Sequence, residues 1–297
     1  MIEEKYISIS DTEIFIVVKG QGFPLFVLHG GPGLDHHAFG SYLDDLSQDY
    51  QLIFVDLRGQ GKSKDVDFKT LTTKRMAQDI VEIAKHLGYG EYGLVGHSFG
   101  AFVALQHGVD FPGVAKYIVL IAGASSGKEV LEYTALNYAK IPSKLVNRVQ
   151  KAQINLEKSK TSEEFHKAWG EYTSFYFSYP TNEEQLAAFN KKTLDVNIRF
   201  DVLNHCQKTG FGFFDVSKDL NKVSSPVLIL AGEQDNVCSL EGQININRKL
   251  QNSKLIVFKT GHMVFAENKP KFLEEIRSFI KIWFLSLYKD IEAHFKF

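Results

Sequence analysis

A serine lies between two glycines at residues 96–100, in the pattern Gly-His-Ser-Phe-Gly. A serine hydroxyl acts as a nucleophile when a neighbouring base takes its proton. The apolar residues before Ser98 predict a buried strand, and residues 101–111 have helical spacing. A strand that turns into a helix at one residue strains the backbone there, and Gly96 and Gly100 remove Cβ atoms that would collide. We therefore predict that Ser98 is a nucleophile presented at the start of a helix.

Two later strands end in residues that could complete such a site. One apolar stretch runs into Asp235 and another into His262. Because ligands of an open parallel sheet bind beyond the carboxyl ends of its strands, we expect both side chains near Ser98. His262 would then take the serine proton, and Asp235 would hold the imidazole in the required tautomer. Glu233 is the neighbouring competitor for the role of the acid.

The stretch His-Gly-Gly-Pro-Gly, residues 29–33, follows the third predicted strand. Acyl transfer places negative charge on a carbonyl oxygen, which two backbone N–H groups can stabilise. We expect one of these groups from Phe99 and the other from Gly31. His29 is expected to support the loop by hydrogen bonding rather than to react.

Strands alternate with helices along most of the chain, which predicts an α/β fold with a doubly wound, mostly parallel sheet. Strands are expected at 6–10, 13–20, 23–30, 50–59, 91–98, 115–123, 226–232 and 253–261, and helices at 72–87, after Ser98, between the last two strands and after Pro270. The alternation stops between residues 124 and about 217. We therefore predict an α/β core at 1–124 and 218–297, with a helical cap inserted at 125–217.

The predicted cap is rich in aromatic residues, including Trp169 and Tyr172. Most of these suit the core of the cap, and together they suggest an apolar pocket wall. Because a substrate ammonium would need a carboxylate there, Glu163, Glu164 and Glu171 are candidates, with Glu171 the first choice.

Composition excludes several classes. The 297 residues carry a formal net charge of −1, with 44% hydrophobic content, and show no basic patch for nucleic acid. The acidic N-terminus is unlike a signal peptide, and no apolar run reaches the roughly 20 residues that a membrane span needs. Two cysteines, Cys206 and Cys238, exclude a disulfide scaffold and favour a cytoplasmic protein. We expect no cofactor and no metal, and a small-molecule or short-peptide substrate; the sequence leaves the oligomeric state open.

Taken together, the chain resembles the α/β-hydrolase superfamily along nearly its whole length. HGGPG, DLRGQGKS (56–63), GHSFG, PVLILAGEQD and TGHMVF are each similar to a landmark of that superfamily. HGGPG resembles the proline iminopeptidase branch, whereas GHSFG is the form common in esterases, and DLRG departs from the DQRG of that branch. The resemblance implies Ser98, Asp235 and His262 as the triad, with Gly31 and Phe99 as the oxyanion hole.

These features predict a serine hydrolase that cleaves a small acyl substrate. A proline iminopeptidase-like aminopeptidase is the first hypothesis, and a carboxylesterase or lactonase, or a hydrolase of carbon–carbon bonds, is the alternative. A different class, a non-catalytic ligand-binding protein on a hydrolase scaffold, would be distinguished by an unreactive Ser98.

Overall fold

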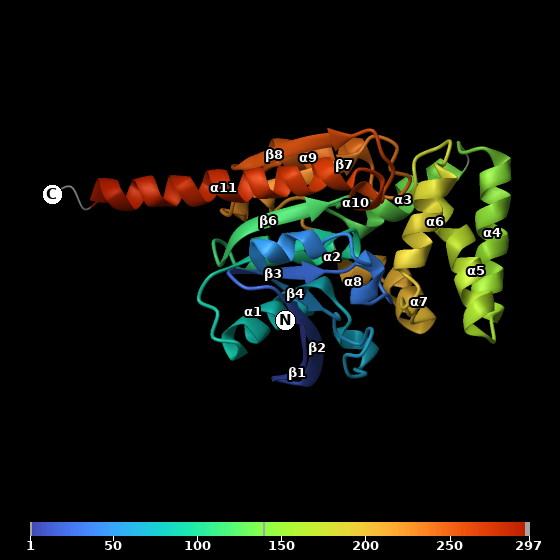
Figure 1. The fold of residues 1–297 in the computed structure, drawn as a ribbon, viewed down its shortest axis with the longest axis horizontal. Helices are drawn as coiled ribbons and strands as arrows, with labels where there is room; N and C mark the ends of the chain where they lie inside the picture. Colours follow the sequence, from blue (N-terminus) through green and yellow to red (C-terminus); the bar gives the residue numbers. More distant parts are fainter. Residues whose placement is uncertain (1, 139, 295–297) are drawn as a thin grey trace.

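The sheet is the centre of the molecule. In the computed structural model, which describes residues 2–138 and 140–294 apart from the side chains of Tyr138, Ser162 and 283–294, one sheet has the strand order β1-β2-β4-β3-β5-β6-β7-β8 (Figure 1). β1 and β2 form an antiparallel hairpin, and β2 pairs antiparallel with β4. The remaining pairs are parallel. The predicted mostly parallel α/β sheet is confirmed.

The strands follow the predicted apolar runs closely, and their bounds are β1 (Ile2–Ile9), β2 (Thr12–Lys19), β3 (Phe23–Leu28), β4 (Tyr50–Val55), β5 (Tyr92–His97), β6 (Ala115–Ile121), β7 (Val227–Gly232) and β8 (Ser253–Phe258). β3 and β4 end earlier than predicted. The glycine loop begins directly after β3. In the loop after β4, the carboxylate of Asp56 accepts hydrogen bonds from the backbone N–H groups of His36 and Lys62. These two loops lie at the carboxyl ends of their strands, where the site is expected.

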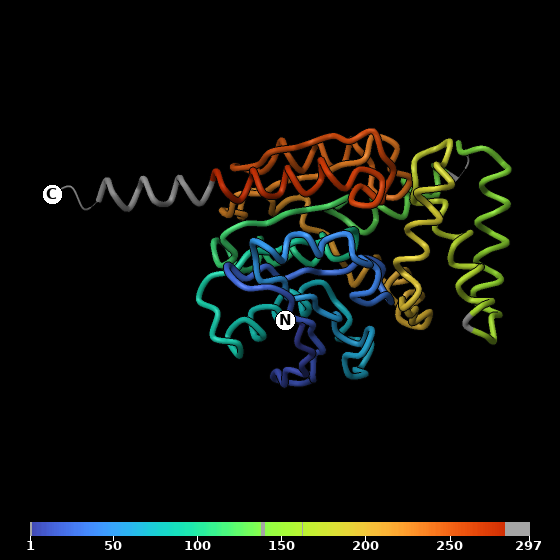
Figure 2. The backbone as a smooth tube through the Cα atoms, viewed as in Figure 1, coloured from blue at the N-terminus to red at the C-terminus, as the bar shows by residue number. Residues whose placement is uncertain are grey.

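Helices cover both faces of the sheet. α1 (Thr73–His86), α2 (Phe99–Asp110) and α9 (Leu240–Lys249) pack on one face, and the first part of α11 (Lys269–His294) packs on the other. Alternate strand residues point to opposite faces, so Leu94 of β5 joins the first core and Val95 the second. The tube in Figure 2 shows how the first part of α11 runs along the sheet. Of the helices described, none is both long enough and apolar enough to cross a membrane.

A group of helices separates β6 from β7. It comprises α3 (Gly127–Tyr138), α4 (Ser143–Lys158), α5 (Ser162–Tyr172), η4 (Thr173–Tyr176), α6 (Glu183–Lys192), α7 (Phe200–Lys208) and α8 (Gly210–Phe213). In Figure 1, α4 to α7 stand beyond one end of the sheet, opposite the chain's C-terminus. The chain leaves the sheet for this group at residues 125–127 and returns at 214–216, and these two segments lie side by side. The N–H of Gly127 donates to the carbonyl of Phe214, and the N–H of Val216 donates to the carbonyl of Ser125.

Short helical turns complete the chain. They are η1 (His36–Phe39), η2 (Asp44–Gln48), η3 (Phe68–Thr70), η5 (Leu220–Lys222) and α10 (Val264–Glu267). Two of them flank loops that matter for function: η1 follows the glycine loop, and α10 follows His262.

Candidate active site

Ser98 stands at a sharp turn between β5 and α2. Its backbone has φ 51° and ψ −116°, a conformation that costs a non-glycine residue about 1–3 kcal/mol. The strand and the helix cross so closely that a Cβ on Gly96 would collide with the carbonyl of Gly100. A Cβ on Gly100 would in turn collide with the carbonyl of Leu28. The glycines therefore make the strained turn possible, and the turn holds the Ser98 hydroxyl beyond the end of the sheet.

Asp235 and His262 are brought together from the ends of β7 and β8. The Nδ1 atom of His262 lies 2.8 Å from Oδ2 of Asp235. Oδ1 of Asp235 accepts hydrogen bonds from the N–H groups of Val237 and Cys238, at 2.7 and 2.9 Å. Since the Asp235 carboxylate accepts, Nδ1 of His262 carries the proton and Nε2 is left as an acceptor. Glu233, the competing acid in the sequence, is exposed.

The loop that carries His262 is fixed by the end of η4 and the residues that follow it. The carbonyl of Tyr176 accepts hydrogen bonds from the N–H groups of His262, at 2.7 Å, and Met263, at 3.2 Å. The carboxylate of Glu267 joins the same two segments, because it accepts from the N–H of Gly261 and from both the N–H and the hydroxyl of Ser178. Burial raises the pKa of Glu267. The position of His262 thus depends on the helical group as well as on the sheet.

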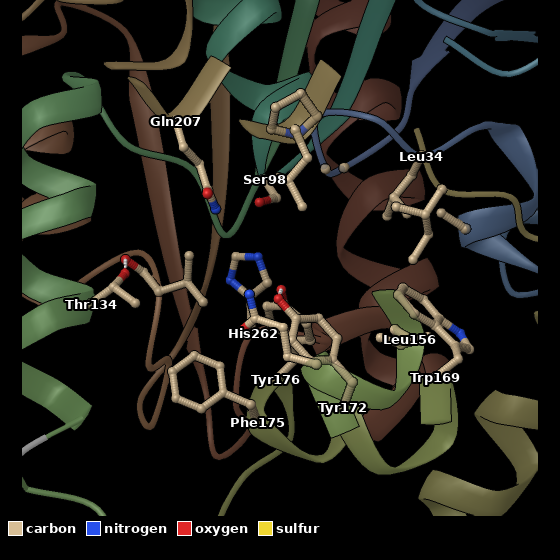
Figure 3. A pocket seen from close by; sticks show the side chains of 18 of the residues that line it. Leu34, Ser98, Thr134, Leu156, Trp169, Tyr172, Phe175, Tyr176, Gln207 and His262 are labelled. Atoms are coloured by element: carbon tan, nitrogen blue, oxygen red, sulfur yellow. Dashed lines mark hydrogen bonds between the residues drawn. The ribbon is translucent and has the colours of Figure 1, made fainter. Parts of the chain in front are cut away.

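Ser98 and His262 line one cavity of about 470 Å³. Figure 3 shows the Ser98 hydroxyl pointing toward the His262 ring across this space. The walls are mostly apolar and aromatic, with contributions from the glycine loop, α3, α4, η4 and α7. The side chains labelled in Figure 3 are Leu34, Ser98, Thr134, Leu156, Trp169, Tyr172, Phe175, Tyr176, Gln207 and His262. A cavity of this size and lining accommodates a small organic substrate.

The glycine loop forms another wall of the cavity. Gly30 and Gly31 line it together with Ser98, and Gly31 has φ 115°, which a residue with a side chain rarely adopts. Phe99, the first residue of α2, follows Ser98 directly. Within residues 2–138 and 140–294, no side chain or loop carbonyl accepts a hydrogen bond from the N–H of Gly31 or Phe99. Both predicted donors therefore keep their hydrogen-bonding capacity for a ligand.

Two other histidines hold neighbouring segments together, and one of them, His97, also lines the cavity beside Ser98. Nε2 of His97 lies 3.2 Å from the carbonyl oxygen of His262 and ties the strand before Ser98 to the His262 loop. Burial holds the pKa of His97 well below its usual range. His36 has the appearance of an ordinary surface residue in the sequence. In the structure it is partly buried, and its Nδ1 atom lies 2.7 Å from Oδ1 of the buried Asp56.

The sequence-predicted pocket residues separate into two groups. Trp169 and Tyr172 line the cavity with Ser98, and their rings stack with centroids 6.2 Å apart. Glu171 does not line this cavity. It faces a separate cavity of about 280 Å³ whose lining includes Glu164 and Lys167. Because consecutive residues of a helix point about 100° apart, Glu171 faces away when its neighbours Trp169 and Tyr172 face the cavity.

The carboxylate that does line the main cavity is Glu157, near the end of α4, and sequence reasoning missed it. Its side chain is exposed. Burial raises the pKa of Tyr172, and the negative charge of Glu157 adds to that effect, so the two groups are close. Gln150, Gln153 and Glu157 form a polar stripe at helical spacing. That stripe is readable in the sequence, but only the docking of α4 shows that it faces a cavity.

One group of potential metal ligands exists among the described residues. The ligand atoms of Asp235, Cys238 and His262 all lie within 4.8 Å of one another, whereas the sequence suggested no such cluster. The carboxylate and the imidazole already bond to each other. Burial raises the pKa of the Cys238 thiol well above its usual value, and a neutral thiol is a poor metal ligand. The residues present therefore do not favour a metal here.

The chain is similar to known proteins along most of its length. Residues 24–269 match the α/β-hydrolase fold family. A proline iminopeptidase from Saccharolobus solfataricus is 25% identical over 311 aligned positions, which cover 97% of this chain and 96% of that protein. A pyrrolizixenacetamide deacetylase from Xenorhabdus hominickii is 21% identical, over 92% of this chain and 97% of that protein.

A solved structure extends the likeness to three dimensions. An α/β-fold hydrolase from Bacillus anthracis superposes with a TM-score of 0.78 at 22% identity, and the match covers 94% of this chain and 99% of that one. The similarity to the Saccharolobus solfataricus protein confirms the resemblance to the proline iminopeptidase branch. The chain belongs to the α/β-hydrolase fold family and is an enzyme of that hydrolase type.

Proposed function

We propose that the protein hydrolyses a small acyl substrate with Ser98 as nucleophile, His262 as base and Asp235 as the acid that orients His262. The observation that carries this proposal is that His262, which is hydrogen-bonded to the buried Asp235, lines the same cavity as Ser98. The N–H groups of Gly31 and Phe99 would stabilise the oxyanion. The helical segment at residues 125–217 would act as a cap that closes the cavity over these groups.

The reaction would proceed in two steps. Oγ of Ser98 attacks the carbonyl carbon while its proton passes to Nε2 of His262, and the tetrahedral oxyanion is held by the two N–H groups. The bond to the leaving group then breaks, and His262 returns the proton to the departing oxygen or nitrogen. A water molecule next attacks the acyl-enzyme and gives one proton to His262. The bond between the acyl carbon and Oγ of Ser98 then breaks, His262 returns the proton to Oγ, and the acid is released.

The cavity favours an uncharged acyl group. Burying an ammonium ion among apolar side chains costs several kcal/mol unless a carboxylate pairs with it. Trp169, Tyr172 and Leu156 form an apolar wall, and the single lining carboxylate among the described residues, Glu157, has an exposed side chain. We therefore favour esters or amides of small neutral acids. The similarity to a deacetylase is consistent with this class.

An aminopeptidase is the second candidate. It is favoured by the His-Gly-Gly-Pro-Gly loop, by the similarity to the proline iminopeptidase, and by Glu157, which could pair with an α-ammonium group at the mouth of the cavity. This hypothesis replaces Glu171 with Glu157 as the ammonium partner.

A matched substrate panel separates the two candidates. Prolyl, N-acetylprolyl and butyryl arylamides and a butyryl aryl ester would be compared by kcat/KM. We expect the butyryl and N-acetylprolyl compounds to be cleaved faster than the prolyl arylamide. The opposite order, with activity lost on acetylation, would establish the aminopeptidase. If no compound of the panel and of a wider set of acyl esters were hydrolysed, the hydrolase proposal itself would fail.

A further inference from the structure

His29 lies directly behind the glycine loop. It follows β3, its side chain is fully buried, and it is not among the residues that line the cavity. Its Nδ1 atom lies 2.7 Å from the carbonyl oxygen of Gly30. Its Nε2 atom lies 3.1 Å from the backbone nitrogen of Leu57, in the loop after β4. Both ring nitrogens therefore have backbone partners.

These two partners fix the tautomer of His29. The backbone N–H of Leu57 can only donate, so Nε2 must accept and carries no proton. Nδ1 of the neutral ring then carries the proton and donates it to the carbonyl oxygen of Gly30. Burial lowers the pKa of His29, so the ring stays neutral and this arrangement is retained. Protonation of Nε2 would make it a donor too, and its N–H would then face the backbone N–H of Leu57.

The bond to Gly30 also fixes the direction of the next N–H group. In a trans peptide the C=O and N–H bonds point in opposite directions. The described cis peptide bonds are Gly31-Pro32 and Tyr179-Pro180, so the peptide between Gly30 and Gly31 is trans. Its carbonyl points toward the buried ring of His29, and its N–H, which belongs to Gly31, must point the other way. Gly31 lines the cavity with Ser98, so an N–H on the side away from His29 is placed to face that cavity.

We propose that His29 is a positioning residue, which acts through the Gly30 carbonyl to turn the Gly31 N–H toward the oxyanion of the substrate. The proposal rests on the proposed function and adds to it how the oxyanion hole is held ready. Rotation of this one peptide would present a carbonyl oxygen to the oxyanion instead of a donor. The hydrogen bond from His29 opposes that rotation, and the bond from Leu57 anchors the ring to the next loop of the sheet.

Two substitutions separate the two hydrogen bonds. In His29→Asn the amide nitrogen occupies the place of Nδ1 and can still donate to Gly30, whereas the acceptor for Leu57 is lost. In His29→Gln the amide oxygen reaches the place of Nε2 and can accept from Leu57, whereas the donor to Gly30 is lost. Each variant loses one buried hydrogen bond, so the two should be similarly destabilised. A merely structural role would affect their activities equally.

We expect kcat of His29→Gln to fall roughly 10- to 100-fold with KM little changed, because one oxyanion donor is no longer held in place. The affinity for an alkyl trifluoromethyl ketone, which forms a tetrahedral adduct with the serine, should fall by the same factor. His29→Asn should keep kcat and this affinity close to wild type. Equal losses in the two variants, or no loss in His29→Gln, would overturn the proposal.

A measurement on the unmodified protein covers the case in which the variants do not fold. Nitrogen-15 NMR of the histidine rings distinguishes a protonated Nδ1 from a protonated Nε2, and we expect His29 with its proton on Nδ1. A proton on Nε2 would overturn the proposal. The Ser98→Ala variant distinguishes a failure of the proposed function from a failure of the role of His29. If Ser98→Ala kept full activity, the proposed function would fail; if it were inactive while His29→Gln kept its kcat, only the role of His29 would fail.

Discussion

Asp235 and His262 are 27 positions apart in the chain, yet Nδ1 of the histidine lies 2.8 Å from Oδ2 of the aspartate. They meet because β7 and β8 are adjacent parallel strands, so the loops at their carboxyl ends emerge at the same edge of the sheet. Both side chains are almost fully buried. This relationship orients the imidazole and leaves Nε2 available toward the cavity that Ser98 lines.

Replacing the acid should therefore impair the chemical step rather than binding. In Asp235→Asn the amide can donate to His262, which favours the tautomer with its proton on Nε2 and removes the base. We expect kcat to fall by about 10⁴-fold with a much smaller change in KM. Glu233→Gln, at the exposed neighbouring acid, is the matched control and should keep wild-type kcat. Steady-state kinetics of both variants make the comparison, and equal activities would contradict the assigned role.

Charge recognition at the cavity mouth can be tested on α4. Glu157 lines the main cavity, whereas Glu171 on α5 lines the separate one. If an amino substrate is used at all, Glu157→Gln should lower its kcat/KM by about fivefold, since an exposed ion pair contributes up to about 1 kcal/mol. Neutral acyl esters should be unaffected, and Glu171→Gln should change neither. An equal effect of both variants on the amino substrate would contradict the assignment.

The turn at Ser98 should tolerate no added methyl group. A Cβ at Gly100 would meet the backbone of Leu28 and His29, which cannot move as a flexible side chain would. We expect Gly100→Ala to lower the free energy of unfolding by about 1–3 kcal/mol and to reduce activity, because α2 must shift away from β3. Gly90→Ala is the control, since a Cβ there meets nothing within 4 Å. Urea denaturation of the two variants should differ clearly, and similar midpoints would contradict the close crossing.

A buried histidine away from the cavity should make stability depend on pH. Nε2 of His107 lies 2.8 Å from the Tyr92 hydroxyl, and Nδ1 has no hydrogen-bond partner. Burial lowers the pKa of His107 from 6.5 to about 4. Between these values the unfolded chain binds a proton that the folded protein does not, so stability is present above about pH 6.5 and falls as the pH falls toward 4.

The contribution of His107 to this loss should be about 2 kcal/mol between pH 7 and pH 5. His107→Gln removes the titrating group, so its free energy of unfolding should fall less over the same interval. Denaturant titrations of both proteins at the two pH values measure the difference. Parallel losses in the two proteins would show that His107 does not titrate in this way.

The residues around Ser98 were predictable because their signal is local. Each of Ser98, Asp235 and His262 follows a recognisable apolar strand, and parallel topology alone places such strand ends together. The glycines of the turn are likewise dictated by backbone geometry at one position. The strand order and the covering helices follow from the same alternation of elements, so the core of the fold was also within reach of the sequence.

The cavity wall was less predictable because it depends on how helices dock. Glu171 lies between two aromatic residues and was the obvious anchor, yet helical rotation turns it into another cavity. Glu157 lines the main cavity only because α4 packs with that stripe inward. Phe211 and Phe213 adopt positive φ in α8, a conformation that no residue pattern signals for phenylalanine. His36 was similarly hidden, since its burial depends on the distant Asp56.

The central claim is that Ser98 is the nucleophile, and covalent labelling tests it most directly. The protein and its Ser98→Ala variant would be treated with a fluorophosphonate, and the adduct would be located by mass spectrometry. We predict one adduct per chain on Ser98, none in the variant, and a loss of kcat in the variant of roughly 10⁴- to 10⁶-fold. A Ser98→Ala variant that is still labelled and still hydrolyses substrate at the wild-type rate would contradict the account.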